Sequence, residues 1–231
     1  MTRPPVFHAL TATAQEWRRV VEHLPLACVP LADIRFHGHH LPYGTDLLIT
    51  TAACEQLLHR VGGMLFPPLP WPDVRSGTSV KMMVRMARDL QQKGFLTVVF
   101  LGPPCRNPEG VHVIGETGNA VTNDSSRQVI FTSIGELLRR GEASELGSTL
   151  ETSLMMWQYP NLVKLPFLDD PRYGTEGIIG PAPQLEASPQ RGREWLDTVL
   201  DILTVMVKDA RAGQTVKPAW YYAQKHGEIF P

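Results

Sequence analysis

Short apolar runs alternate along this chain with longer amphipathic segments. The short runs have the length and the aliphatic or aromatic content of buried strands. We expect strands at residues 24–31, 64–69, 95–101 and 129–132. In the longer segments apolar residues recur every three or four positions, which is the helical period. We expect helices at residues 46–60, 79–93, 133–140, 151–158 and 189–212. Strands that alternate with helices favour an α/β layer fold with a mostly parallel sheet.

The loops that follow the predicted strands are the natural place for a ligand. The run at 95–101 is apolar at nearly every position, as in strands that are buried on both faces of a parallel sheet. In such sheets ligands bind outside the carboxyl ends of the strands. The loops at 35–46 and 102–107 both leave the ends of predicted strands, so we expect them to share one crevice. Residues 102–127 and 174–188 are expected to be long irregular loops.

Composition excludes several classes of protein. With 231 residues, 43% of them apolar and 19% charged, the chain is typical of a soluble globular protein with a sizeable core. A net charge of -1 and the lack of a basic run argue against a nucleic-acid partner. No apolar stretch approaches the roughly 18 residues that span a bilayer, and the N-terminus does not resemble a secretory signal. Three widely spaced cysteines favour a reducing, cytoplasmic setting.

The densest chemistry lies at residues 35–46, Arg-Phe-His-Gly-His-His-Leu-Pro-Tyr-Gly-Thr-Asp. Three histidines and a carboxylate fall within twelve residues, and glycines and a proline bend the path. Side chains that converge on a cation or on a reacting centre are often arranged in this way. However, Arg35 stands at the front of the segment, where its positive charge opposes a metal ion.

This segment resembles the signature of the creatininase (creatinine amidohydrolase) family, which reads roughly Glu-Gln-His-Gly-Pro-His-Leu-Pro-Leu-Gly-Thr-Asp. Further matches follow in the family's order along the chain. They are Pro-Pro-Leu-Pro at 67–70, Gly-Thr at 77–78, Gly-Phe at 94–95, Glu-Thr-Ser at 151–153 and a Gly-rich stretch at 174–192. The resemblance covers about residues 22–210.

The resemblance implies a three-layer α/β/α sandwich with a mostly parallel sheet. It implies one domain over residues 1–231, with its core at about 22–210 and an aromatic C-terminal tail at 213–231. Family members are often hexameric, and they hydrolyse C–N bonds of cyclic amides and related small molecules with two divalent metals. We therefore expect a small-molecule substrate and a homo-oligomer, either a hexamer or a dimer.

The chain departs from the family at the metal ligands. His37 and Asp46 fall on two of the family's five ligand positions, but Arg35 stands where a glutamate belongs. With the second ligand loop aligned through Asn107, Pro104 replaces a histidine and Arg106 a glutamate. Three of the five ligand positions are thus lost.

A second departure lies just before the Glu-Thr-Ser segment. There the family's His-Ala-Gly becomes Leu-Gly-Ser at 146–148, although Glu145 keeps an acidic group beside it.

We interpret these changes as a pocket without metal. Two dications removed from buried carboxylates leave negative charge that is costly to bury, and arginine supplies permanent positive charge in its place. In this hypothesis Arg35 and Arg106 hold an anionic or carbonyl group of the substrate. His37 is the acid/base, and Asp46 orients it. Glu145 completes the candidate catalytic set, and the candidate substrate-binding residues are His39, His40, Tyr43, Trp71 and Cys105.

Three alternatives stay open. His37, His39 and Asp46 with a water would satisfy a single catalytic zinc, at the cost of repulsion from Arg35. A different alignment of 102–127 would recruit Glu109, His112 and Glu116 as metal ligands. Finally, the loss of ligands also fits a non-catalytic subunit that binds or assembles. A purely structural interpretation is also open for two of these residues. In it, Asp46 only caps a helix and Arg35 only forms a salt bridge with Asp33 or Glu145.

The C-terminal tail is dense in aromatic residues, with Trp220, Tyr221, Tyr222 and Phe230 close together. Such rings are costly to leave in water. We expect the tail to pack at a subunit interface.

Overall fold

A parallel sheet runs through the middle of the computed structural model, which describes residues 4–70, 77–104, 127–138 and 145–227. The strands are β1 (Val6–His8), β2 (Leu26–Ala32), β3 (Gly63–Leu65), β4 (Leu69–Pro70), β5 (Thr97–Gly102) and β6 (Gln128–Ser133). Their order is β1-β3-β2-β5-β6, and β4 pairs with the carboxyl end of β2. All the described pairings are parallel. Every residue of β2, β5 and β6 is buried, as the continuous apolar runs predicted.

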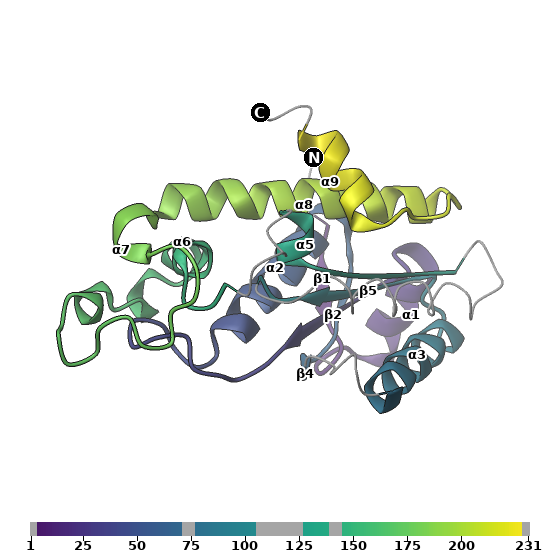
Figure 1. Ribbon diagram of the computed structural model, residues 1–231. Coiled ribbons are helices and arrows are strands. Elements are labelled where there is room, and N and C mark those ends of the chain that lie inside the picture. The colour runs from purple at the N-terminus through teal and green to yellow at the C-terminus, as the bar shows by residue number, and fades with distance from the viewer. Residues whose placement is uncertain (1–3, 71–76, 105–126, 139–144, 228–231) are drawn as a thin grey trace.

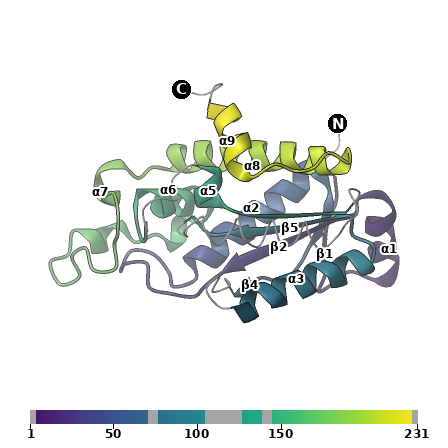
Figure 2. The ribbon, with the colours of Figure 1, turned by 45° about the vertical axis from the view of Figure 1, so that its right-hand side comes forward.

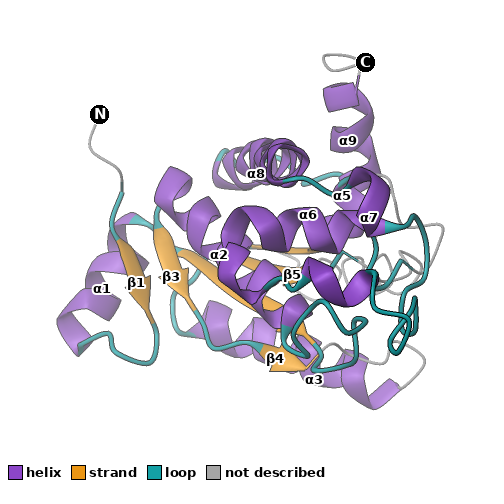
Figure 3. Cartoon of the chain, turned by 90° about the vertical axis from the view of Figure 1, so that its left-hand side faces the viewer, coloured by secondary structure: helices purple, strands orange, loops and turns teal. Residues whose placement is uncertain are grey.

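Helices cover both faces of this sheet (Figures 1 and 3). They are α1 (Ala14–His23), α2 (Thr45–Val61), α3 (Gly77–Gln92), α5 (Ile134–Leu137), α6 (Thr149–Gln158), α7 (Pro183–Glu186), α8 (Pro189–Arg211) and α9 (Ala219–Gly227). Two 3-10 turns, η1 (Pro160–Leu162) and η2 (Leu165–Leu168), follow α6. One apolar core joins the sheet to α2, α5, α6, α8 and α9, and a second joins its other face to α1 and α3. The predicted three-layer α/β/α sandwich is therefore confirmed.

The local structure differs from the expectation in a few places. The run at 64–69 is broken into β3 and β4, because two prolines at 67–68 cannot donate to a ladder. The loop at 174–188 contains the short helix α7, which begins at a proline. A strand and a helix that the sequence did not predict precede the first predicted strand. Residues 6–8 form β1, and α1 begins at Ala14 behind a capping box in which Thr13 and Glu16 satisfy each other's backbone.

The strand order has its switch point between β2 and β5. From β2 the chain moves through α2 to β3 on one side, and from β5 it moves to β6 on the other. The two connections diverge at the carboxyl ends of these neighbouring strands, which is where α/β sheets bind ligands. The segment with the three histidines leaves the carboxyl end of β2 and leads into α2, so it lies at this point.

The C-terminal helix packs on its own chain. Tyr222 and Ala223 of α9 are buried in the core that α8 shares, whereas Trp220 is half exposed. Figure 1, Figure 2 and Figure 3 together show α9 lying to one side of α8. Its expected place in a subunit interface, and the expected oligomer, stay predictions. None of the described helices combines the length and the apolar character that crossing a bilayer requires.

Candidate functional site

The loop between β2 and α2 is closed by its own backbone. The N–H of Arg35 donates to the carbonyl of Tyr43 at 3.1 Å, so the loop ends lie side by side. The hydroxyl of Thr45 donates to the carbonyl of Pro42 at 2.7 Å and starts α2. Gly38 has a φ of 77°, a left-handed value that favours glycine. The folded loop buries the side chains of His37 and Asp46 completely.

Helix α6 brings a second carboxylate to the loop. Ser148 caps this helix, and Gly147, with a φ of 58°, turns the chain into it. A side chain at Gly147 would collide with the carbonyl of His37, because an added Cβ would lie 2.6 Å from that oxygen. The Gly147 N–H donates to Oε2 of Glu151 at 2.6 Å. This close approach sets Glu151 against the histidine loop.

Glu151 determines which nitrogen of His37 carries the proton. Its Oε2 lies 2.9 Å from Nδ1 of His37 and also accepts the Gly147 N–H, so it acts as an acceptor. Nδ1 of His37 is therefore the donor, and in the neutral ring Nε2 keeps its lone pair. Among the described residues, Nε2 is buried without a hydrogen-bond partner. An imidazole prepared in this way can accept a proton or bind a metal ion.

Asp46 pairs with Arg35 rather than with His37. The Nε of Arg35 donates to Oδ2 of Asp46 at 2.9 Å, whereas the His37 Nε2 lies 3.8 Å from the same oxygen, beyond hydrogen-bond reach. Burial and the nearby Glu151 raise the pKa of Asp46 to about 6, and Arg35 and His37 act against that rise. Within the described part of the chain, Oδ1 of Asp46 is buried and accepts no hydrogen bond. The expected orienting role of Asp46 thus falls to Glu151.

His40 forms a second contact between the loop and α6. Its Nε2 lies 2.8 Å from the Thr152 hydroxyl, and the ring is fully buried. Burial lowers the pKa of His40 to about 4, so the ring is neutral near pH 7. Glu151 and Thr152 were not expected at the site. The Glu-Thr-Ser segment signalled a helix start, and only the fold shows that this start faces the histidines.

The remaining candidates separate into those near the cluster and those away from it. Nε2 of His39 lies 3.4 Å from Glu176 and its ring stacks against Tyr173, so the alternative zinc set of His37, His39 and Asp46 is not assembled. Tyr43 is largely exposed. Glu145 is buried and accepts a hydrogen bond from the Ser148 hydroxyl at 2.9 Å. Asp46 lies in the first turn of α2 and the cap is Gly44, so the helix-cap interpretation is wrong. The other candidates, Trp71, Cys105, Arg106, Glu109, His112 and Glu116, lie outside the described residues.

The cluster around His37 offers ligand atoms for a metal ion. Within the described ranges, His37, Asp46 and Glu151 offer ligand atoms that lie within 4.8 Å of one another. The Oε2 of Glu151 already holds His37, so it orients a ligand. Arg35 already pairs with Oδ2 of Asp46, so this oxygen is not available to a metal ion. The described residues therefore do not fit a pair of metals, whereas the unpartnered His37 Nε2 and Asp46 Oδ1 fit a single one.

Comparison with known proteins agrees with this architecture. Residues 11–207 match the family model described as "Creatininase: Creatinine amidohydrolase". A creatinine amidohydrolase from Pseudomonas putida is 24% identical over 225 residues, which cover 79% of this chain and 86% of that protein. The solved structure "Creatininase Mn" superposes with a TM-score of 0.69 at 18% identity, over 89% of this chain and 98% of that one. A creatininase mutant described as "Zn-Zn type" gives 0.68 at 19% identity, over 87% and 97%.

Proposed function

Since the chain belongs to the creatininase family, we propose that it is an enzyme that acts on the C–N bond of a small cyclic amide. The reaction is hydrolysis of the ring or, in a biosynthetic setting, ring closure. It proceeds without the two-metal centre that the family resemblance implies. The observation that carries this proposal is the ion pair at 2.9 Å between Arg35 and Asp46. In this pair a guanidinium neutralises a carboxylate that the family resemblance assigns to a metal ion.

His37 is the proton-transfer group of this reaction. Its Nδ1–H is held by Glu151 and its Nε2 lone pair faces the buried cluster. In hydrolysis Nε2 takes a proton from water, the hydroxyl adds to the amide carbon, and the C–N bond breaks as the proton passes to the leaving nitrogen. Glu151 stabilises the imidazolium that forms between these steps. Ring closure follows the same path in reverse.

Arg35 supplies the positive charge beside this group. Its side chain is 27% exposed, so it reaches from solvent to the buried Asp46. A guanidinium stays protonated and offers donors in a planar fork, which suits a carbonyl oxygen or a carboxylate of the substrate. Arg106 is proposed for the same role from the sequence alone. We also propose that the active protein is a homo-oligomer and that it is located in the cytoplasm.

One observation favours a second version of this site. The His37 Nε2 and the Asp46 Oδ1 are both buried acceptors without a partner in the described structure, and one divalent ion such as zinc would satisfy both. Such an ion supplies Lewis-acid chemistry when bound. The substrate and the roles of Glu151 and His37 are otherwise unchanged.

The test is turnover by protein purified without a histidine tag and treated with chelator. Cyclic amides and their ring-opened amino acids are incubated in both directions, and products are followed by mass spectrometry. We expect turnover without metal and a loss of about 100-fold or more in His37→Gln. His23→Gln, at an exposed position of α1 on the other face of the sheet, is the matched control. Turnover that needs added zinc supports the single-metal version, and full activity of His37→Gln overturns both.

A further inference from the structure

Two hydrogen-bond acceptors lie close together at the centre of the candidate site. In the neutral ring of His37, Nε2 carries a lone pair, because Nδ1 keeps the proton that it shares with Glu151. The carboxylate of Asp46 is also an acceptor, and its Oδ2 lies 3.8 Å from that nitrogen. Two acceptors do not bond to each other, so a third group that donates to both is needed to satisfy them.

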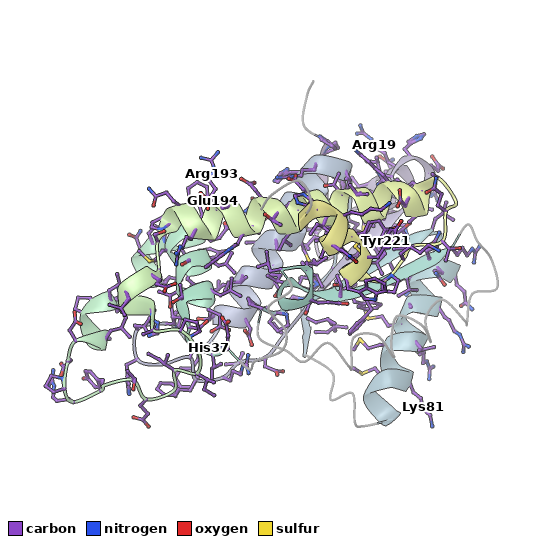
Figure 4. The ribbon with its side chains drawn as sticks, turned by 45° about the horizontal axis from the view of Figure 1, so that its top comes forward. Arg19, His37, Lys81, Arg193, Glu194 and Tyr221 are labelled. Carbon is purple, nitrogen blue, oxygen red and sulfur yellow. The ribbon has the colours of Figure 1, made fainter. Side chains whose placement is uncertain are left out.

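Both acceptors are shielded from bulk water. The side chains of His37 and Asp46 are fully buried, and among the described residues neither Nε2 of His37 nor Oδ1 of Asp46 has a hydrogen-bond partner. Figure 4 shows His37 well separated from Lys81 of α3 and from Tyr221 of α9. Since buried polar atoms are nearly always satisfied, this pair of atoms indicates a place for a donor.

The directions of the two acceptors are fixed from behind. The Nε of Arg35 donates to Oδ2 of Asp46 at 2.9 Å, which leaves Oδ1 as the open acceptor. On the other side, Oε2 of Glu151 lies 2.9 Å from Nδ1 of His37 and holds the ring in place. The two open atoms are therefore oriented before any ligand enters.

We propose that Oδ1 of Asp46 and Nε2 of His37 together hold the water molecule that attacks the substrate. This role rests on the proposed function, and it makes Asp46 a residue that contacts the reacting atoms. Water is neutral, so the guanidinium of Arg35 does not repel it as it repels a metal ion. One O–H group points to His37 and the other to Asp46, which leaves the oxygen lone pairs free for the amide carbon.

The two hydrogens of this water have different fates. As the water oxygen bonds to the amide carbon, the first proton passes to Nε2 of His37 and the π electrons of the carbonyl move onto its oxygen. When the carbonyl re-forms and the C–N bond breaks, His37 gives that proton to the leaving nitrogen. The second hydrogen stays on the added oxygen, beside Asp46, and becomes the carboxyl proton of the product. Asp46 thus positions the water, and His37 is the base.

Asp46→Asn reverses the hydrogen bond at this position and keeps the shape of the side chain. The amide has one oxygen, and the Nε of Arg35 needs an acceptor, so the oxygen should face Arg35 and the NH₂ group should face the water. An NH₂ group donates, which turns the water away from His37. In the chelator-treated protein we expect kcat to fall about 100-fold, with KM changed less than about twofold.

A double variant separates this role from a purely structural one. Arg35→Met removes the donor that fixes the amide, so in Arg35→Met/Asp46→Asn the amide oxygen can turn back to the water. Arg35→Met lowers turnover by itself, but adding Asp46→Asn to it should cost less than about fivefold. Asp201→Asn breaks a comparable pair with Arg60, in the last turn of α2, and is the control that should keep full turnover.

A crystal structure of the chelator-treated wild type tests the water site without turnover. We expect one ordered water within hydrogen-bond reach of both atoms and no anomalous signal at the zinc edge. A metal ion there, no ordered water, or an equal cost of Asp46→Asn with and without Arg35 overturns the proposal. Full kcat in Asp46→Asn overturns it but leaves the proposed function intact. An ordered water in a protein that turns over no cyclic amide supports the water site and overturns the proposed function.

Discussion

The guanidinium of Arg35 lies 2.9 Å from Oδ2 of Asp46, and the imidazole of His37 approaches the same oxygen from 3.8 Å. One carboxylate oxygen thus faces a permanent cation and a titratable ring. The other oxygen is buried without a partner in the part of the chain that the structure describes. This asymmetry leads to the first prediction.

Arg35→Glu should increase the number of metal ions that the protein holds. The change removes the competing charge at Asp46 and adds a carboxylate ligand. We expect at most one equivalent of zinc in the wild type and about two equivalents in the variant, measured by elemental analysis after dialysis. Arg35→Gln removes the charge without adding a ligand and should hold no more than about one equivalent. Two zinc ions per wild-type chain would contradict the assignment of Arg35 as a stand-in for a cation.

Glu151→Gln should change the protonation of the His37 ring. The wild-type neutral ring should carry its proton on Nδ1, because Oε2 of Glu151 accepts from it. An amide can offer either a donor or an acceptor, so the preference for Nδ1–H should weaken. Nitrogen-15 NMR of the imidazole reports the tautomer directly, and turnover should fall about 10- to 100-fold. Glu186→Gln, at the exposed last residue of α7, is a matched control that should leave both readings unchanged. An unaltered tautomer in Glu151→Gln would disprove the orienting role.

Gly147→Ala should destabilise the fold and disturb the site together. The φ of 58° disfavours a side chain, and the added Cβ would lie 2.6 Å from the His37 carbonyl. Gly174→Ala is the control, because its φ of 54° carries a similar backbone cost but an added Cβ meets nothing within 4 Å. We expect a loss of about 1 kcal/mol for Gly174→Ala and about 3 kcal/mol for Gly147→Ala in urea unfolding. Equal losses would show that the contact with His37 has no energetic role.

His40 should make the protein less stable as the pH falls. Burial lowers its pKa from the ordinary 6.5 to about 4, so between these values the unfolded chain binds a proton that the folded chain does not. Stability is therefore lost as the pH falls through this window, by at most about 3 kcal/mol. We expect the stability difference between wild type and His40→Gln to shrink on acidification, measured by urea unfolding of chelator-treated protein between pH 7 and pH 4.

Asp46 should act in the opposite direction over nearly the same window. Its pKa is raised from 3.8 to about 6, so the folded state keeps a proton that the unfolded chain releases as the pH rises. Stability from this group is present below about pH 4 and is lost as the pH rises through 6, again by at most about 3 kcal/mol. The difference between wild type and Asp46→Asn should therefore grow on acidification. If both variants shift the profile in the same direction, one of the two assignments is wrong.

Much of the layer architecture was predictable from the chain. The run at 95–101 is apolar on both faces, and it forms β5 in the middle of the sheet. The spacing of apolar residues over 189–212 predicted α8 to within one residue of its end. These elements were predictable because burial against the neighbouring layers requires apolar residues at defined positions along the sequence. β1 was missed because three residues at an edge are too short to show a period.

The site was predictable only in part. Residues 35–46 form one local loop, so the closeness of Arg35 to Asp46 follows from their spacing. The partner of His37 could not be found in this way, because Glu151 lies 114 positions away and only the packing of α6 brings it near. His39 shows the reverse error. It shares the loop with His37, but its ring turns outward to Tyr173 and Glu176.

That separation along the chain also has a kinetic consequence. The contact between His37 and Glu151 closes a loop of about half the polypeptide, and distant contacts of this kind are slow to form. During synthesis this contact is delayed further, because the histidine loop leaves the ribosome long before α6 has been made. The imidazole should therefore gain its fixed orientation among the last events of folding, after β2, β5 and α2 have already assembled.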